Sequence, residues 1–251
     1  MTYCVAISLD AGLVFVSDSR THAGVDNVST YSKMHRFGHD GERQFVLLSA
    51  GNLATTQGVI TQLKKDIKQG VPVNLMTMAH MNDAAEYIGD LNRQQQEKHS
   101  SSGTTFEASF IIGGQIAGGD PACYMVYPQG NYITTSDDTP FLQIGESKYG
   151  KPILDRILTT ASTLETAALC ALVSMDSTMR SNITVGPPIE VMIYERDSFV
   201  LDHHYRFDES SDYLRQLGRT WDARLREAFN NLPPIAWSAN WDRDDGIAGK
   251  Q

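Results

Sequence analysis

The chain has 251 residues, of which 41% are hydrophobic and 20% are charged, a balance that excludes a disordered protein and permits one large domain or two small ones. Its formal charge of -9, without any Lys/Arg-rich run, argues against a nucleic-acid partner. No apolar run approaches the roughly 20 residues of a membrane span, and no signal peptide is visible. We therefore expect a cytoplasmic protein with no membrane partner.

The first fifth of the chain predicts two β-hairpins. Residues 2–9 and 13–18 are apolar, β-branched runs separated by an Asp-Ala-Gly turn. Residues 31–37 and 44–50 form a second pair around a loop that contains two glycines. The strands of each pair are expected to lie side by side.

The hydrophobic period then becomes helical. One face is formed by Leu53, Ile60, Leu63 and Ile67, and a second helix is expected over residues 74–98. Strands return in "FEASFIIGGQ", "ACYMVYPQG" and "YITTS".

Residues 147–205 predict a second pair of helices followed by two strands. A helix is expected over 147–158, followed by a helix whose face carries Leu164, Ala168, Leu172, Met175 and Met179. The strands "IEVMIYE" and "FVLDHHY" come next. The order predicts an α+β protein in which two antiparallel sheets pack together with helices outside.

The C-terminal part stands apart from this order. Residues 1–207 are assigned to the main domain and residues 208–251 to a C-terminal helix and tail, expected to belong to the same domain. Two interpretations of the tail stay open: a helix packed on its own domain, or a subunit contact that covers Trp237 and Trp241.

Thr2 is the candidate nucleophile. A threonine hydroxyl is weakly nucleophilic at neutral pH and needs a base nearby. If Met1 is removed, Thr2 carries a free α-amine, whose ordinary pKa of about 7.7 to 8.0 makes it a usable base. One residue would then supply both groups.

Three further residues complete the candidate site. Lys33 is a candidate cation near the hydroxyl, and Asp18 could pair with it. Gly51 ends a predicted strand just before a helix, so its backbone N–H could face a developing oxyanion.

These stretches resemble a known family. Thr2, "VSDSR" with Asp18, "SKMHRF" with Lys33, and "SAGN" with Gly51 are similar to the N-terminal-threonine hydrolases of the proteasome β-subunit and HslV type, and within them to the bacterial Anbu subunits. "FIIGGQIAGGDPACYMVYPQGNYI" and "IGESKYGKPILDRIL" agree with this, and the resemblance covers residues 2–205 well. It implies a four-layer αββα sandwich (the Ntn-hydrolase fold), self-assembly, and amide hydrolysis by Thr2 with Lys33, Asp18 and the Gly51 amide.

The supporting hydroxyls of that family match less well. Where proteasome subunits have Gly-Ser-Gly, this chain has Gly145-Glu146-Ser147, so the hydroxyl is either replaced by a carboxylate or moved to Ser147. A glutamate near the amine would raise the amine pKa. Ser181 is the second candidate, although Asp176 precedes it at a longer interval than the family's Asp-x-x-Ser.

Other motifs favour structural roles. Cys4, Cys123 and Cys170 are expected to be buried hydrophobic residues rather than a disulfide or zinc set. The glycine-rich stretch 113–119 is expected to be a hairpin turn rather than a phosphate loop, and the adjacent His203 and His204 would point to opposite faces of a strand. No metal and no cofactor are assigned.

Two functions follow as hypotheses. The first is a threonine hydrolase that cleaves peptide or small amide bonds and assembles as a homo-oligomer, either a ring or an open spiral. The second is a proteasome-like shell or binding scaffold with little proteolytic activity. The substrate and any unfoldase partner are not readable from the sequence.

Overall fold

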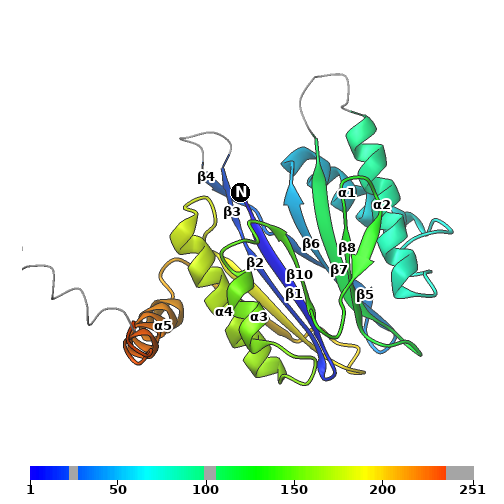
Figure 1. The fold of residues 1–251 in the computed structure, drawn as a ribbon. Helices are drawn as coiled ribbons and strands as arrows, with labels where there is room; N and C mark the ends of the chain where they lie inside the picture. The colour runs from blue at the N-terminus through cyan, green and yellow to red at the C-terminus, as the bar shows by residue number, and fades with distance from the viewer. Residues whose placement is uncertain (23–27, 99–105, 236–251) are drawn as a thin grey trace, which may run out of the picture. The chain divides into compact units, whose positions relative to one another are not determined.

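The computed structural model describes residues 1–22, 28–98 and 106–235 (Figure 1). By its contacts the chain divides into two compact units, residues 1–211 and 212–251. All the sheets and the candidate site belong to the first unit.

The first unit contains a five-stranded antiparallel sheet in the order β10-β1-β2-β11-β12. Its strands are β1 (Tyr3–Leu9), β2 (Gly12–Asp18), β10 (Phe141–Gly145), β11 (Ile189–Glu195) and β12 (His203–Phe207). The central strands β1 and β2 are almost wholly buried, because a helix covers one of their faces and a second sheet covers the other.

The second sheet is also five-stranded and antiparallel, in the order β5-β6-β7-β8-β9. Its strands are β5 (Met34–His39), β6 (Arg43–Gly51), β7 (Ala108–Ile116), β8 (Ala122–Val126) and β9 (Tyr132–Thr134). A small separate ribbon pairs β3 (Arg20–His22) with β4 (Val28–Thr30).

Helices cover the outer face of each sheet, which gives four layers (Figure 1). The helices of this unit are α1 (Leu53–Gln69), α2 (Met81–Glu97), α3 (Lys151–Ile157) and α4 (Leu164–Ser181). Helix α4 contacts β1, β2 and β11, whereas α1 and α2 contact the second sheet. The expected αββα sandwich is therefore confirmed.

Two apolar clusters stabilise the layers. One joins the facing sides of the two sheets and includes Phe15 of β2, Leu48 of β6 and Met192 of β11. The other, with Phe45 and Leu63, lies between the second sheet and its helices. Cys4, Cys123 and Cys170 are buried free thiols, as the sequence predicted, and burial raises their pKa values.

Several predicted boundaries are wrong. The helix expected from residue 74 begins at Met81, and the helix expected from 147 begins at Lys151, because turns precede both. The strand expected at 199–205 begins only at His203. Within the stretch 113–119, Gly113 and Gly114 lie in β7, so the turn follows later.

The second unit contains helix α5 (Asp212–Asn230). Its one buried residue among those described is Gly218, and the side chains of Leu225 and Phe229 are 53% and 71% exposed. Trp237 and Trp241 lie outside the described residues. No helix in the described ranges is long and apolar enough to cross a membrane.

Candidate active site

Thr2 lies immediately before β1, at the end of the first sheet. Its carbonyl oxygen accepts a hydrogen bond from the Glu146 amide at 2.7 Å, and the next residue, Tyr3, pairs with Gly145 of β10. The end of β10 therefore fixes the backbone of Thr2.

This close approach requires a glycine at position 145. Gly145 has φ +84°, and a Cβ built there would lie 1.9 Å from the Thr2 carbonyl oxygen. We expect Gly145→Ala to displace Thr2 and to lower the free energy of unfolding by about 1 to 3 kcal/mol from backbone strain alone. Thermal unfolding, compared with Gly119→Ala in an open turn, measures this; equal melting temperatures for the two variants would contradict it.

Lys33 and Asp18 form a buried ion pair. The Lys33 Nζ lies 2.7 Å from Asp18 Oδ1 and donates a second hydrogen bond to the Arg20 carbonyl, also at 2.7 Å. Asp18 is fully buried and Lys33 is 7% exposed. Asp18 also accepts hydrogen bonds from the backbone amides of Tyr3 at 3.0 Å and Gly186 at 3.2 Å. Four contacts thus hold the pair in one geometry.

Two pKa shifts describe the electrostatics of this region. Burial raises the pKa of the Asp18 carboxyl, against the opposing effect of Lys33 and the two amides. The α-amine of the chain, carried here by Met1, has a pKa below its usual 8.0, because burial and then Lys33 lower it more than Asp18 and Glu146 raise it. A lowered pKa leaves more free amine at neutral pH, which favours a base.

Gly51 lies where β6 ends and α1 begins, two residues after Ser49, whose amide donates to the Lys33 carbonyl at 3.0 Å. It has φ +107°, and a Cβ would lie 2.4 Å from the Glu107 carbonyl oxygen. The next residue, Asn52, caps α1 by accepting hydrogen bonds from the amides of Ala54 and Thr55. The turn between β6 and α1 is thus held by the close approach of Gly51 to Glu107 before it and by the Asn52 cap after it.

A groove of about 830 Å³ joins these residues. Thr2, Lys33, Gly51 and Gly145 all line it, so the structure brings together the candidates for nucleophile, cation and oxyanion donor. The other lining residues are Met1, Thr21, Tyr31, Ser32, His35, Ser49, Ala50, Asn52, Leu53, Thr56, Gln57, Ile60 and Thr61. Lys33 is the one Lys, Arg, Asp or Glu among them. Burial, with a contribution from Lys64, lowers the pKa of His35 to about 4, so its imidazole adds no charge to the groove at ordinary pH.

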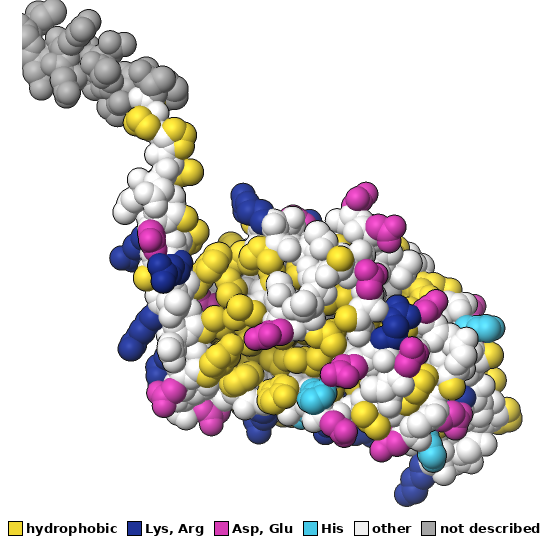
Figure 2. Space-filling model, turned by 90° about the horizontal axis from the view of Figure 1, so that it is seen from below, with side chains coloured by type: hydrophobic (Ala, Val, Ile, Leu, Met, Phe, Trp, Pro, Cys, Tyr) yellow, Lys and Arg dark blue, Asp and Glu magenta, His cyan; other side chains and the backbone are white. Residues whose placement is uncertain are grey.

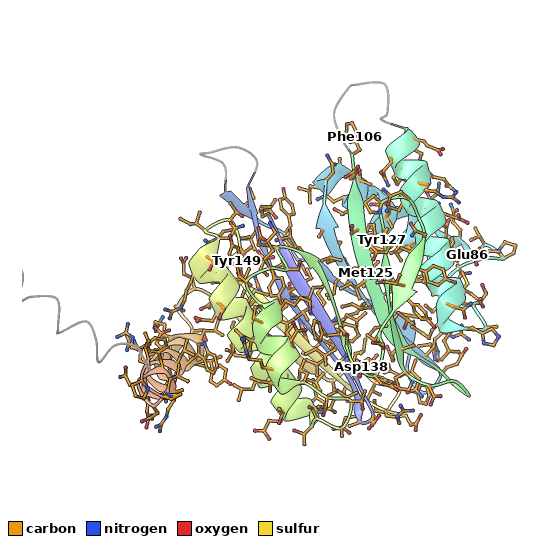
Figure 3. All side chains as sticks on the ribbon, viewed as in Figure 1. Glu86, Phe106, Met125, Tyr127, Asp138 and Tyr149 are labelled. Carbon is orange, nitrogen blue, oxygen red and sulfur yellow. The ribbon has the colours of Figure 1, made fainter. Side chains whose placement is uncertain are left out.

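The two candidate serines lie elsewhere. Ser147 lines a different hollow, of about 340 Å³, together with Met125 of β8 (labelled in Figure 3). Ser181 is exposed at the end of α4, and Asp176 pairs with Arg180. Neither serine is among the residues that line the groove.

Sequence reasoning missed Tyr3, the residue directly after Thr2, and Asn182, which contacts Glu146. Tyr3 is fully buried, and its hydroxyl lies 2.6 Å from both Ser174 Oγ and Gln143 Nε2. Asn182, directly after α4, donates a hydrogen bond to Glu146 Oε2 at 3.1 Å. The one sequence feature that could have pointed to Asn182 is Glu146, a carboxylate at a position where proteasome subunits have a serine. In the described ranges, no cluster of three or more His, Cys, Asp or Glu residues is placed to hold a metal.

The chain matches the proteasome subunit family over residues 2–194. It is 47% identical to Anbu (ancestral beta-subunit) from Yersinia bercovieri, with a TM-score of 0.89 over 93% of this chain and 98% of that chain. The chain belongs to the Anbu branch of the proteasome subunit family. A comparison with curated proteins found no match.

Two further structures support this Anbu assignment. The helical assembly of the Anbu complex from Pseudomonas aeruginosa is 47% identical, with a TM-score of 0.90 over 94% of this chain and 100% of that chain. Anbu from Hyphomicrobium sp. strain MC1 is 45% identical, with a TM-score of 0.87 over 93% and 99% of the two chains. The family predicted from the sequence is therefore confirmed.

Proposed function

We propose that this Anbu-family subunit hydrolyses peptide or small amide bonds, with Thr2 as nucleophile after removal of Met1. The observation that carries the proposal is that Thr2, Lys33 and Gly51 line one groove, with Lys33 held by the buried carboxylate of Asp18. Membership of the proteasome subunit family supports it.

The proposed reaction assigns one role to each group. Thr2 Oγ attacks the substrate carbonyl carbon, and its proton passes to the Thr2 amine. Lys33 stabilises the developing negative charge on Oγ, and the Gly51 amide donates to the oxyanion. Collapse expels the amine product, which takes the proton, and water then hydrolyses the acyl ester on Thr2.

The groove also indicates a substrate class. Its walls combine apolar side chains, such as Leu53 and Ile60, with uncharged polar ones. Among the described residues that line it, the one charged side chain is Lys33, which is already paired with Asp18. Since a charged side chain would lose its hydration without gaining a partner, we assign peptides with an uncharged residue before the scissile bond.

Hydrolysis of a fluorogenic leucyl or tyrosyl peptide amide tests the proposal. We expect activity in the protein trimmed to Thr2, loss of activity in Thr2→Ala, and measurable activity in Thr2→Ser, which keeps a hydroxyl. Undiminished hydrolysis by Thr2→Ala would show that another nucleophile acts. No hydrolysis by the trimmed protein would favour the second candidate function.

That second function is an assembling shell or scaffold with little proteolytic activity. Two observations favour assembly in either case: the Pseudomonas aeruginosa relative forms a helical assembly, and this chain exposes apolar side chains. Figure 2 shows hydrophobic side chains gathered on one face of the first unit, and Leu225 and Phe229 of α5 are exposed. Apolar surface of this kind is typical of interaction sites.

We expect the protein to be a homo-oligomer, in a ring or an open spiral. Removal of residues 231–251, which include the 60% exposed Leu232, should lower the number of subunits in the assembly, because apolar contact area is lost. Phe229→Asp should also reduce the number of subunits. Multi-angle light scattering measures the mass, with Glu165→Gln as a surface control. A monodisperse monomer of the full chain would contradict this expectation.

A further inference from the structure

The turn after β10 and the end of α4 meet beside Thr2. The Glu146 amide donates to the Thr2 carbonyl, and the Glu146 side chain is only 8% exposed. Asn182 Nδ2 donates to Glu146 Oε2 at 3.1 Å. The Asn182 amide is itself oriented, because its Oδ1 accepts hydrogen bonds from the Thr184 amide at 3.0 Å and the Thr184 hydroxyl at 2.6 Å. Glu146 is therefore held by a neutral donor rather than by a cation.

Three charged side chains act on the α-amine of Met1, the residue directly before Thr2: Lys33, Asp18 and Glu146. Asp18 is already bonded to Lys33 and to two backbone amides. Among the described residues, the Glu146 carboxylate accepts a hydrogen bond from the uncharged amide of Asn182. Its negative charge thus remains available to an ammonium group nearby.

We infer that Glu146, oriented by Asn182, is a positioning residue that holds the ammonium group formed when the Thr2 amine takes the hydroxyl proton. This inference rests on the proposed function. The proton moves from Thr2 Oγ to Thr2 N, and the Glu146 side chain accepts a hydrogen bond from the resulting ammonium.

A carboxylate in this place has an effect that a hydroxyl would not have. It stabilises the charged form of the amine, so the amine is a stronger base but is less often free at neutral pH. Hydrolysis should therefore rise toward alkaline pH. Removing the carboxylate should lower the amine pKa and weaken the base, which moves the onset of activity to lower pH and lowers the rate reached at high pH.

The test compares the trimmed protein with Glu146→Gln, which keeps the size of the side chain and an oxygen that can accept from Asn182. The kcat and KM for the fluorogenic leucyl peptide amide are measured across about pH 5.5 to 9.5, a range that brackets the usual α-amine pKa. The α-amine is titrated separately by competitive acetylation with acetic anhydride and mass spectrometry, which requires no catalysis. Glu195→Gln, an exposed carboxylate at the far end of β11, is the matched control.

We expect Glu146→Gln to shift the midpoints of both the kcat profile and the amine titration to lower pH, to lower the kcat plateau several-fold, and to leave KM nearly unchanged. The two kcat profiles should converge or cross at low pH. Asn182→Ala should give a smaller shift in the same direction, and Glu195→Gln none.

Two results are to be distinguished. An unchanged amine titration in Glu146→Gln, with kcat lowered equally at every pH, would overturn the inference because it indicates a structural role. A shifted amine titration without Thr2-dependent hydrolysis in any variant would support Glu146 as the partner of the amine and refute the proposed function instead.

Discussion

We expect Lys33→Ala to lower Thr2-dependent hydrolysis by at least roughly 100-fold, the scale of a lost electrostatic stabiliser at a reacting oxygen. The Lys33 ammonium lines the groove and is fixed by Asp18 and the Arg20 carbonyl, so neither water nor a neighbour replaces it in the same geometry. Lys33→Arg should fail for a geometric reason, because the guanidinium is planar and bulkier than the ammonium group. The kcat for the fluorogenic peptide amide measures both.

This experiment needs a control for loss of stability, because a variant that unfolds would also be inactive. Lys33→Ala leaves the carboxylate of Asp18 buried without its cation, which costs about 3 to 5 kcal/mol in typical proteins. The double variant Lys33→Ala/Asp18→Asn removes both charges, and Asn Oδ1 can still accept from the Tyr3 amide, which donates to Asp18 Oδ1, although the Gly186 amide, which donates to Oδ2, loses its acceptor. We expect the double variant to melt at a higher temperature than Lys33→Ala and to be equally inactive, whereas Asp18→Asn alone should be milder. Full activity in either variant that lacks Lys33 would refute its role.

We expect a blocked N-terminus to abolish the reaction of Thr2 without changing assembly. A residue retained before Thr2 turns the Thr2 amine into an amide, which has no available lone pair to accept the hydroxyl proton. The free amine is then one residue away, and consecutive Cα atoms are about 3.8 Å apart. A protein that keeps a short extension before Thr2 should have the same mass in light scattering as the trimmed protein and no measurable hydrolysis.

The control for this prediction is a protein with the same extension and a protease site that releases Thr2. Cleavage should restore activity, because only the position of the amine changes. If the extended protein hydrolyses the peptide as fast as the trimmed protein, the α-amine is not the base.

The sequence was most informative where a signal is local. The hairpin of residues 2–9 and 13–18 consists of two apolar, β-branched runs around a short turn, and its strands appear at Tyr3–Leu9 and Gly12–Asp18. The helix predicted from Leu53 begins there, after an Asn cap. The pairing of Lys33 with Asp18, suggested by residue type alone, is present in the structure at 2.7 Å.

Nonlocal features could not be predicted in this way. Strand β10 is only five residues long and follows the polar stretch "SDDTP", so its own sequence gives a weak strand signal. It is stabilised by pairing with β1, which lies more than a hundred residues earlier in the chain. The same pairing brings Glu146 to Thr2, and the end of α4 brings Asn182 to Glu146. Motif spacing pointed instead to the hydroxyls of Ser147 and Ser181, which do not line the groove.

The most direct test of Thr2 as an N-terminal nucleophile is covalent labelling with a leucyl peptide α′,β′-epoxyketone, whose two electrophilic carbons react with the hydroxyl and the amine of an N-terminal threonine. Intact-mass measurement followed by peptide mapping locates the adduct. We predict one adduct per subunit, on Thr2, in the protein trimmed to Thr2, and none in Thr2→Ala or in the protein with an extension. An adduct on another residue, or an unlabelled Thr2 in a trimmed protein that hydrolyses the peptide amide, would contradict the proposed mechanism.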